Sequence, residues 1–105
     1  MQNRRVVKPS RVREYARRNS NASASLMAWL KTARGANWKN IQQVRQTYNS
    51  ADGVTVRSGR IVTVFNIGGN HYRLVVSIHY PWAMIYVLGF MTHAEYDKKK
   101  WKEEL

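Results

Sequence analysis

The chain has 105 residues, enough for one domain with one hydrophobic core and too few for a second. Its 18 Lys and Arg residues against 6 Asp and Glu residues give a formal net charge of +12, which favours a polyanionic partner, nucleic acid first, over an ordinary metabolite. The absence of cysteine excludes a disulfide scaffold, a thiolate zinc site and a cysteine nucleophile. We therefore expect a single domain over residues 1–105.

The sequence contains no segment typical of export or of membrane insertion. The longest apolar stretch, Pro81 to Met91, is shorter than the roughly 20 residues that a membrane-spanning helix needs. Arg4 and Arg5 are followed by only two apolar residues, which fits neither a signal peptide nor a twin-arginine signal. We expect a cytoplasmic protein with no membrane partner.

The first half of the chain carries most of the charge and the helical patterns. Arg4 to Lys8 predicts a short strand, and Ser10 to Arg18 and Ala22 to Arg34 carry apolar side chains at helical spacing. Asn37 is expected to cap a third, short helix that presents one apolar side, made of Trp38, Ile41, Val44 and Tyr48. The first helix also bears four arginines, which form either a solvated face or a phosphate-binding surface: Arg11, Arg13, Arg17 and Arg18.

In the second half the hydrophobic period changes to two, which is typical of strands. Arg60–Ile67 and Asn70–His79 flank Gly68-Gly69, and a glycine pair between two strands predicts a hairpin with a two-residue loop. That loop sets the register: Asn66 opposite His71, Phe65 opposite Tyr72, Val64 opposite Arg73 and Thr63 opposite Leu74.

The two faces of this hairpin differ in polarity. One is almost wholly apolar and is expected to pack on the helices: Ile61, Thr63, Phe65, Tyr72, Leu74, Val76 and Ile78. The other mixes valines with polar side chains and is expected to be at least partly open: Val62, Val64, Asn66, His71, Arg73, Val75, Ser77 and His79. Its polar members near the hairpin end mark the place where we expect a site.

Ala83 to Met91 predicts a further strand, and a basic run, Lys98 to Lys102, follows it. The order of elements predicts an α+β fold with a short N-terminal strand and two to three helices packed on one face of a small antiparallel sheet.

Two stretches of the second half resemble a known family. Val64–Leu74, VFNIGGNHYRL, and Thr92–Lys98, THAEYDK, are in this order and spacing similar to the HigB-type toxins of bacterial type II toxin–antitoxin modules. The short strand, the helices and the terminal meander also match the RelE-like toxin fold. The resemblance implies an endoribonuclease that cleaves mRNA on the translating ribosome. It also implies a cognate antitoxin of the HigA type, which commonly carries a helix-turn-helix domain.

The chemistry implied by the resemblance uses the RNA 2′-hydroxyl as the nucleophile and needs neither a metal nor another cofactor. The expected catalytic residues are Arg73, which stabilises the phosphorane charge, His93, which transfers protons, and Tyr96, which stacks on a base or donates its hydroxyl to the phosphate. Some RelE-like relatives use strand lysines instead, but Val62, Val64 and Asn66 occupy the corresponding face here. Further RNA contacts are expected from Arg60, Asn66, Asn70, His71, Lys98 and Lys100.

Each candidate also has a purely structural interpretation. Arg73 could pair with an acid or lie over an aromatic ring, and Tyr96 could anchor a terminal turn to the core. Trp101 could cover the sheet or stack on RNA. A metal site made of His71, His79 and His93 is not expected, because the spacing matches no recognised ligand pattern. The alternative function is a non-catalytic basic module that binds ribosomal RNA or DNA through phosphates alone.

Overall fold

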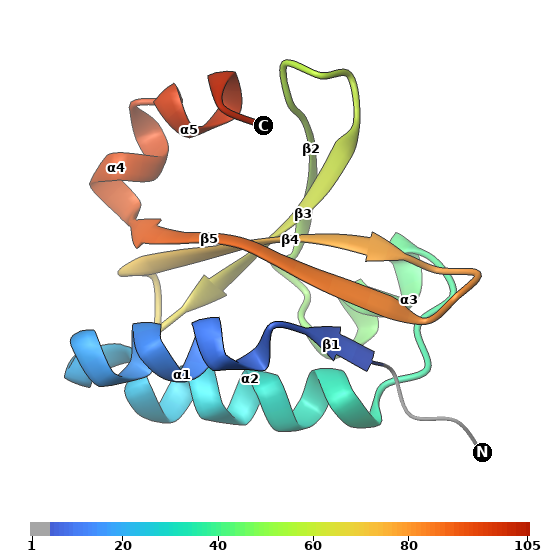
Figure 1. Cartoon of the computed structure of the whole chain (residues 1–105), viewed down its shortest axis with the longest axis horizontal. Coiled ribbons are helices and arrows are strands. Elements are labelled where there is room, and N and C mark those ends of the chain that lie inside the picture. The colour runs from blue at the N-terminus through green and yellow to red at the C-terminus, as the bar shows by residue number, and fades with distance from the viewer. Residues whose placement is uncertain (1–4) are drawn as a thin grey trace.

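A five-stranded sheet lies between two helical layers of unequal size (Figure 1). The computed structural model describes residues 5–105, so Arg4, the predicted start of the first strand, lies outside the described residues. The elements follow in the order β1 (Arg5–Val7), α1 (Pro9–Arg18), a 3₁₀ turn (Ser20–Ala22), α2 (Ser23–Gly35), α3 (Ile41–Thr47), β2 (Asp52–Thr55), β3 (Ile61–Ile67), β4 (Tyr72–His79), β5 (Met84–Thr92), α4 (His93–Asp97) and α5 (Lys100–Glu103). Within these residues, no helix combines the length and the apolar character needed to cross a membrane.

The strand order is β1-β5-β4-β3-β2, which confirms the α+β class and the short N-terminal strand. Neighbouring strands are antiparallel except for β1, which pairs with β5 in parallel, with Val6 opposite Ile85. The sheet is therefore mixed rather than purely antiparallel. A parallel pair needs a crossover connection, and α1, α2 and α3 lie in the long connection between these two strands.

The helices form where the apolar spacing predicts them. In α1 the buried residues are Val12 and Ala16, and Pro9 occupies the first turn, where its missing N–H is harmless. In α2 the buried stripe is Leu26, Trp29, Leu30 and Ala33. The predicted cap of α3 is wrong: Asn40, not Asn37, is the N-cap, because its side chain accepts a hydrogen bond from the backbone of Gln43 at 3.0 Å.

The β3–β4 hairpin has a longer loop than predicted. Ile67 pairs with Tyr72 and Asn66 with Arg73, so four residues, Gly68 to His71, form the loop, and the predicted register is wrong by two residues. Arg73 donates hydrogen bonds to the backbone carbonyl and the side-chain oxygen of Asn70, at 3.2 and 2.9 Å, which holds Asn70 in the loop. Because the shift is an even number, the side chains that remain in β3 and β4 keep their predicted faces, whereas His71 moves into the loop.

The apolar hairpin face packs on α1, α2 and α3 as predicted. Phe65, Leu74 and Val76 are fully buried there, and the Phe65 ring contacts the rings of Trp29, Trp38 and Tyr48.

The opposite face is open only in part, as predicted: Asn66, His71, Ser77 and His79 keep some exposure, whereas the valines and Arg73 are buried. Val62, Val64 and Val75 form a second buried cluster together with Val56 and Trp101. Trp101 lies on α5, so the C-terminal helices form a small cover over this face (Figure 1). The basic run of residues 98–102 therefore has a structural role, because the buried Trp101 within it packs the C-terminal helices onto the sheet.

Candidate active site

The hairpin end of the sheet and the start of α4 meet at one corner of the molecule (Figure 1). Thr92, the last residue of β5, pairs with Tyr72, the first residue of β4. The backbone N–H of His93 donates to the backbone carbonyl of His71 at 2.8 Å. The two histidines are therefore neighbours, although they are 22 positions apart in the sequence. We call this region, made of residues 66–73 and 92–97, the hairpin corner.

A capping box places α4 directly after β5. The Thr92 hydroxyl accepts a hydrogen bond from the Glu95 backbone at 3.1 Å, and the Glu95 carboxylate accepts one from the Thr92 backbone at 2.9 Å. The expected helical turn over residues 93–97 is thus present, with His93 and Tyr96 three residues apart on it. The Thr-x-x-Glu spacing is a sequence signal for this cap that was missed above.

Acid pH should weaken this cap. Hydrogen bonds from the backbone and the hydroxyl of Thr92 hold the pKa of Glu95 below its ordinary value. A carboxyl group with a lowered folded-state pKa stabilises the fold above its unfolded value and loses that contribution as the pH falls through the folded value. Glu95→Gln should therefore lower the free energy of unfolding by about 0.5 kcal/mol near neutral pH, a small effect because the carboxylate is exposed to water. Urea unfolding checks this: the difference from the unmodified protein should shrink towards zero at about pH 3, and an equal difference at both pH values would contradict it.

The His93 side chain is partly exposed, with one ring nitrogen buried against the protein. The side chain is 44% exposed, but Nδ1 is buried and lies 3.4 Å from Oδ2 of Asp97. The contact is close enough for electrostatic attraction and too loose for a hydrogen bond in this structure. A carboxylate beside Nδ1 favours a proton on that nitrogen and leaves Nε2 to exchange protons with a ligand.

Tyr96 lies against both the C-terminal cover and the sheet. Its ring stacks on Trp101 with centroids 5.1 Å apart, and the guanidinium carbon of Arg73 lies 5.6 Å from the ring centroid. Burial raises the pKa of the Tyr96 phenol above its ordinary value; the charges of Asp52 and Asp97 act in the same direction, and Arg73 opposes them. The phenol is therefore protonated at neutral pH and can donate a hydrogen bond. Asp52 lies on β2, and nothing in the sequence indicated that its charge acts on Tyr96.

Arg73 is buried, with 8% of the residue exposed. Besides its bonds to Asn70, the guanidinium donates to the carbonyl of Tyr72 at 3.0 Å, and no carboxylate among residues 5–105 forms an ion pair with it. Of its two structural interpretations, the contact with an aromatic ring is the one observed. Arg73 thus fixes the hairpin loop and adds a positive charge beside Tyr96.

The predicted RNA-binding residues are only partly brought together. Asn66, Asn70 and His71 lie in the hairpin corner, where the Asn66 amide is 3.4 Å from the side-chain oxygen of Asn70. Lys98 and Lys100 line a hollow of about 350 Å³ beside α4, together with the carboxylates of Glu95 and Glu104. Arg60 lies apart, because it precedes the opposite end of β3, six residues or roughly 20 Å from Asn66.

A second hollow, of about 420 Å³, opens beside the hairpin corner and is lined by Asn21, His71, Tyr72 and Thr92. It offers an amide, an imidazole, an aromatic ring and a hydroxyl, which are groups that bind unpaired nucleotides. Asn21 is an unpredicted member, since only the packing of the 3₁₀ turn against the hairpin brings it there. Across residues 5–105, no three His, Asp or Glu side chains gather in a group that could hold a metal ion.

Comparison with known proteins adds one match. The family model described as HigB toxin, the RelE-like toxic component of a toxin–antitoxin system, matches residues 22–99, a span that includes both helices α2 and α3, the hairpin and α4. A search of the curated proteins finds no match to the chain.

Proposed function

The chain belongs to the family of HigB-type, RelE-like toxic components of toxin–antitoxin systems, and on that premise we propose that it is an endoribonuclease that cleaves mRNA on the translating ribosome. Family membership gives the toxin role and implies an antitoxin partner. The observation that carries the proposed reaction is the meeting of His93, Tyr96 and Arg73 at the hairpin corner.

The proposed reaction is an internal displacement within the RNA. The 2′-oxygen forms a bond to the neighbouring phosphorus, and the bond between that phosphorus and the 5′-oxygen breaks. One proton leaves the 2′-hydroxyl and one reaches the departing 5′-oxygen, which gives a 2′,3′-cyclic phosphate and a 5′-hydroxyl. The protein has to orient the nucleotide, exchange these protons and stabilise the negative charge on the phosphate oxygens.

The side chains of the hairpin corner match these tasks. His93 exchanges protons through its solvent-facing ring, with Asp97 as the positioning carboxylate. Tyr96, protonated at neutral pH, donates a hydrogen bond from its hydroxyl to a phosphate oxygen. Because Arg73 is buried, we do not expect its guanidinium to form a bidentate contact with the phosphate. Its role is to supply positive charge beside the Tyr96 ring and to hold Asn70 through hydrogen bonds.

RNA contacts would come from polar side chains around the corner, namely the half-buried Asn66 and the exposed Asn70, His71, Lys98 and Lys100. Arg60 can contribute only to an RNA that extends along the sheet. The basic helix α1 adds a broader surface, although Glu14 already pairs with Arg17 and Arg18 there.

Primer extension on mRNA from cells that express the protein tests the proposal against the non-catalytic alternative. Discrete new 5′ ends, absent when a His93→Ala variant is expressed, are the expected result. Growth arrest without new 5′ ends would favour a basic module that binds ribosomal RNA or DNA. The same mRNA incubated with purified protein, with and without ribosomes, tests ribosome dependence, and cleavage only in their presence is expected.

Tyr96→Phe should separate the hydroxyl from the ring. The variant keeps the ring against Trp101 and Arg73, so its thermal stability should stay close to that of the unmodified protein. Loss of the donated hydrogen bond should slow cleavage by about 100-fold. The measurement is a single-turnover cleavage rate, paired with a thermal melt. A cleavage rate equal to that of the unmodified protein would show that the Tyr96 hydroxyl has no part in the reaction and that Tyr96 is only structural.

A further inference from the structure

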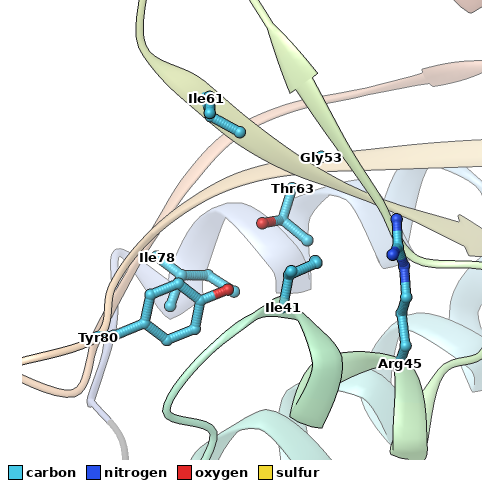
Figure 2. Close-up of a pocket in the computed structure, with 7 residues that line it drawn as sticks. All are labelled: Ile41, Arg45, Gly53, Ile61, Thr63, Ile78 and Tyr80. Atoms are coloured by element: carbon cyan, nitrogen blue, oxygen red, sulfur yellow. The ribbon is translucent and has the colours of Figure 1, made fainter.

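A hollow of about 400 Å³ lies on the helix side of the sheet, at the end away from the hairpin corner. Figure 2 shows its walls: α3 on one side, β2 and β3 on another, and the end of β4 with the turn after it on the third. Its lining is mainly apolar: Ile41, Arg45, Gly53, Ile61, Thr63, Ile78 and Tyr80.

The hollow exists because the helical layer is incomplete. α1 and α2 contact β5 and β1, and α2 reaches β3 only near Phe65, while the seven-residue α3 lies beside the part of β2 and β3 that lines the hollow. Gly53 has no side chain to fill the space, and a Cβ built there would only touch Ile61, at 3.4 Å. Ile61 at the rim is 67% exposed, which is high for a large aliphatic side chain on the core face. Such an aliphatic rim marks a candidate contact surface.

The strand beside the hollow offers a docking edge. β2 is the last strand in the sheet order and pairs with β3 alone in the described part of the chain. An extended segment can add to such an edge through backbone hydrogen bonds. Gly53 pairs with Thr63, so a side chain placed opposite Gly53 on an added strand would project on the same face, over the hollow.

The positive charge near the hollow favours an acidic partner. Arg45 lines the hollow, and two further cations, Lys39 and Arg60, are close in sequence to the lining residues Ile41 and Ile61; all three are exposed. Asp52 lies 3.5 Å from Arg45 and offsets part of its charge, so the attraction of an acidic segment depends more on the net charge of the chain than on Arg45. With a net charge of +12 on the chain, an acidic segment is attracted to this surface over long range.

We propose that the hollow and the outer edge of β2 form the docking site for an extended, acidic segment of the cognate antitoxin, which inserts an aliphatic side chain between Ile61 and Ile78. The inference rests on the toxin–antitoxin premise of the proposed function, not on the RNA chemistry. The site is separate from the hairpin corner: Ile78 lies on the opposite face of the sheet from Arg73 and five residues, or roughly 16 Å, further along β4. A toxin variant that escapes the antitoxin should therefore stay active.

The test compares two substitutions that add the same charge. Ile61→Asp places a carboxylate at the rim of the hollow, and Met27→Asp, at a 41% exposed position on α2, is the matched control. The probe is the antitoxin encoded beside the toxin gene, purified with the toxin as their complex. Ile61→Asp should raise the Kd at least about tenfold and leave cells arrested when both proteins are expressed, while Met27→Asp should be neutralised normally. Equal binding by the two variants would overturn the proposal.

A second variant and a protection measurement guard against indirect effects. Gly53→Val fills the hollow without changing charge and should also raise the Kd about tenfold or more. Hydrogen exchange of the complex should protect the backbone amides of β2, and absence of protection would count against the strand addition. If gel filtration of the toxin alone shows a dimer that Ile61→Asp dissociates, a second copy covers the hollow and the proposal is wrong. These readouts measure binding, so they remain decisive even if the protein does not cleave RNA.

Discussion

Replacing His93 with alanine should abolish growth arrest and slow RNA cleavage by about 10²- to 10⁴-fold, the range lost when a positioned proton-transfer group is removed. The fold should survive, because the side chain is 44% exposed and its one polar contact within residues 5–105 is the loose pair with Asp97. The backbone bond from His93 to His71, which joins α4 to the hairpin, does not depend on the side chain. The measurements are colony formation on induction, a single-turnover cleavage rate and a thermal melt.

His79→Ala is the matched control, because His79 is an exposed histidine at the far end of β4, where its ring packs beside Trp82 and accepts a hydrogen bond from the Trp82 backbone. It should arrest growth like the unmodified protein. Asp97→Asn should give an intermediate rate, since it keeps the shape of the pair and removes the charge that orients the imidazole. If His93→Ala cells arrest as strongly as His79→Ala cells, the hairpin corner is not the catalytic site.

Local patterns predicted α1, α2, β3 and β4 well because each of these elements has one strongly apolar side, whereas the largely exposed β2 was not predicted. The stripe of Leu26, Trp29, Leu30 and Ala33 and the alternation of Phe65 with its neighbours need no tertiary information to be interpreted. The hairpin register, in contrast, could not be predicted without tertiary information. Two glycines favour a two-residue loop, yet both residues after them also lie in the loop, because the buried Arg73 side chain bonds to Asn70. A side chain three residues away thus overrides local turn preference.

The candidate site was only partly predictable for a similar reason. His93 and Tyr96 share a face of α4 by helical spacing, and the cap that begins α4 is encoded by Thr92 and Glu95. Nothing in the sequence places Asn21 beside His71, or brings the charge of Asp52 near Tyr96. The burial of Arg73 was not predicted, because it depends on the contact of its guanidinium with the Tyr96 ring on α4. Of the two alternatives for Trp101, covering the sheet is the one observed, and the indole is an apolar anchor within the lysine run.

Replacement of Trp101 has the largest expected effect on stability. Trp101→Ala should lower the free energy of unfolding by about 3 kcal/mol, the lower end of the range for a buried tryptophan, because Trp101 retains 9% exposure near the chain end. The indole covers Val62, Val64 and Val75, stacks on Tyr96 and donates a hydrogen bond from Nε1 to the Tyr96 carbonyl at 3.1 Å. Its removal takes away the packing that holds α4 and α5 on the sheet.

Trp82→Ala provides the comparison, since Trp82 is 72% exposed and its loss should change the unfolding free energy by less than about 0.5 kcal/mol. Urea unfolding followed by circular dichroism measures both values, and hydrogen exchange locates the loosened region. In Trp101→Ala the amides of residues 93–103 should exchange faster while those of α2 stay protected. Because Tyr96 and His93 are positioned by the same helices, cleavage should fall even under conditions where the sheet and α1–α3 remain folded. If stability drops but the cleavage rate of the folded variant is unchanged, the C-terminal cover does not position the catalytic side chains, and the roles proposed for them would have to be reassigned.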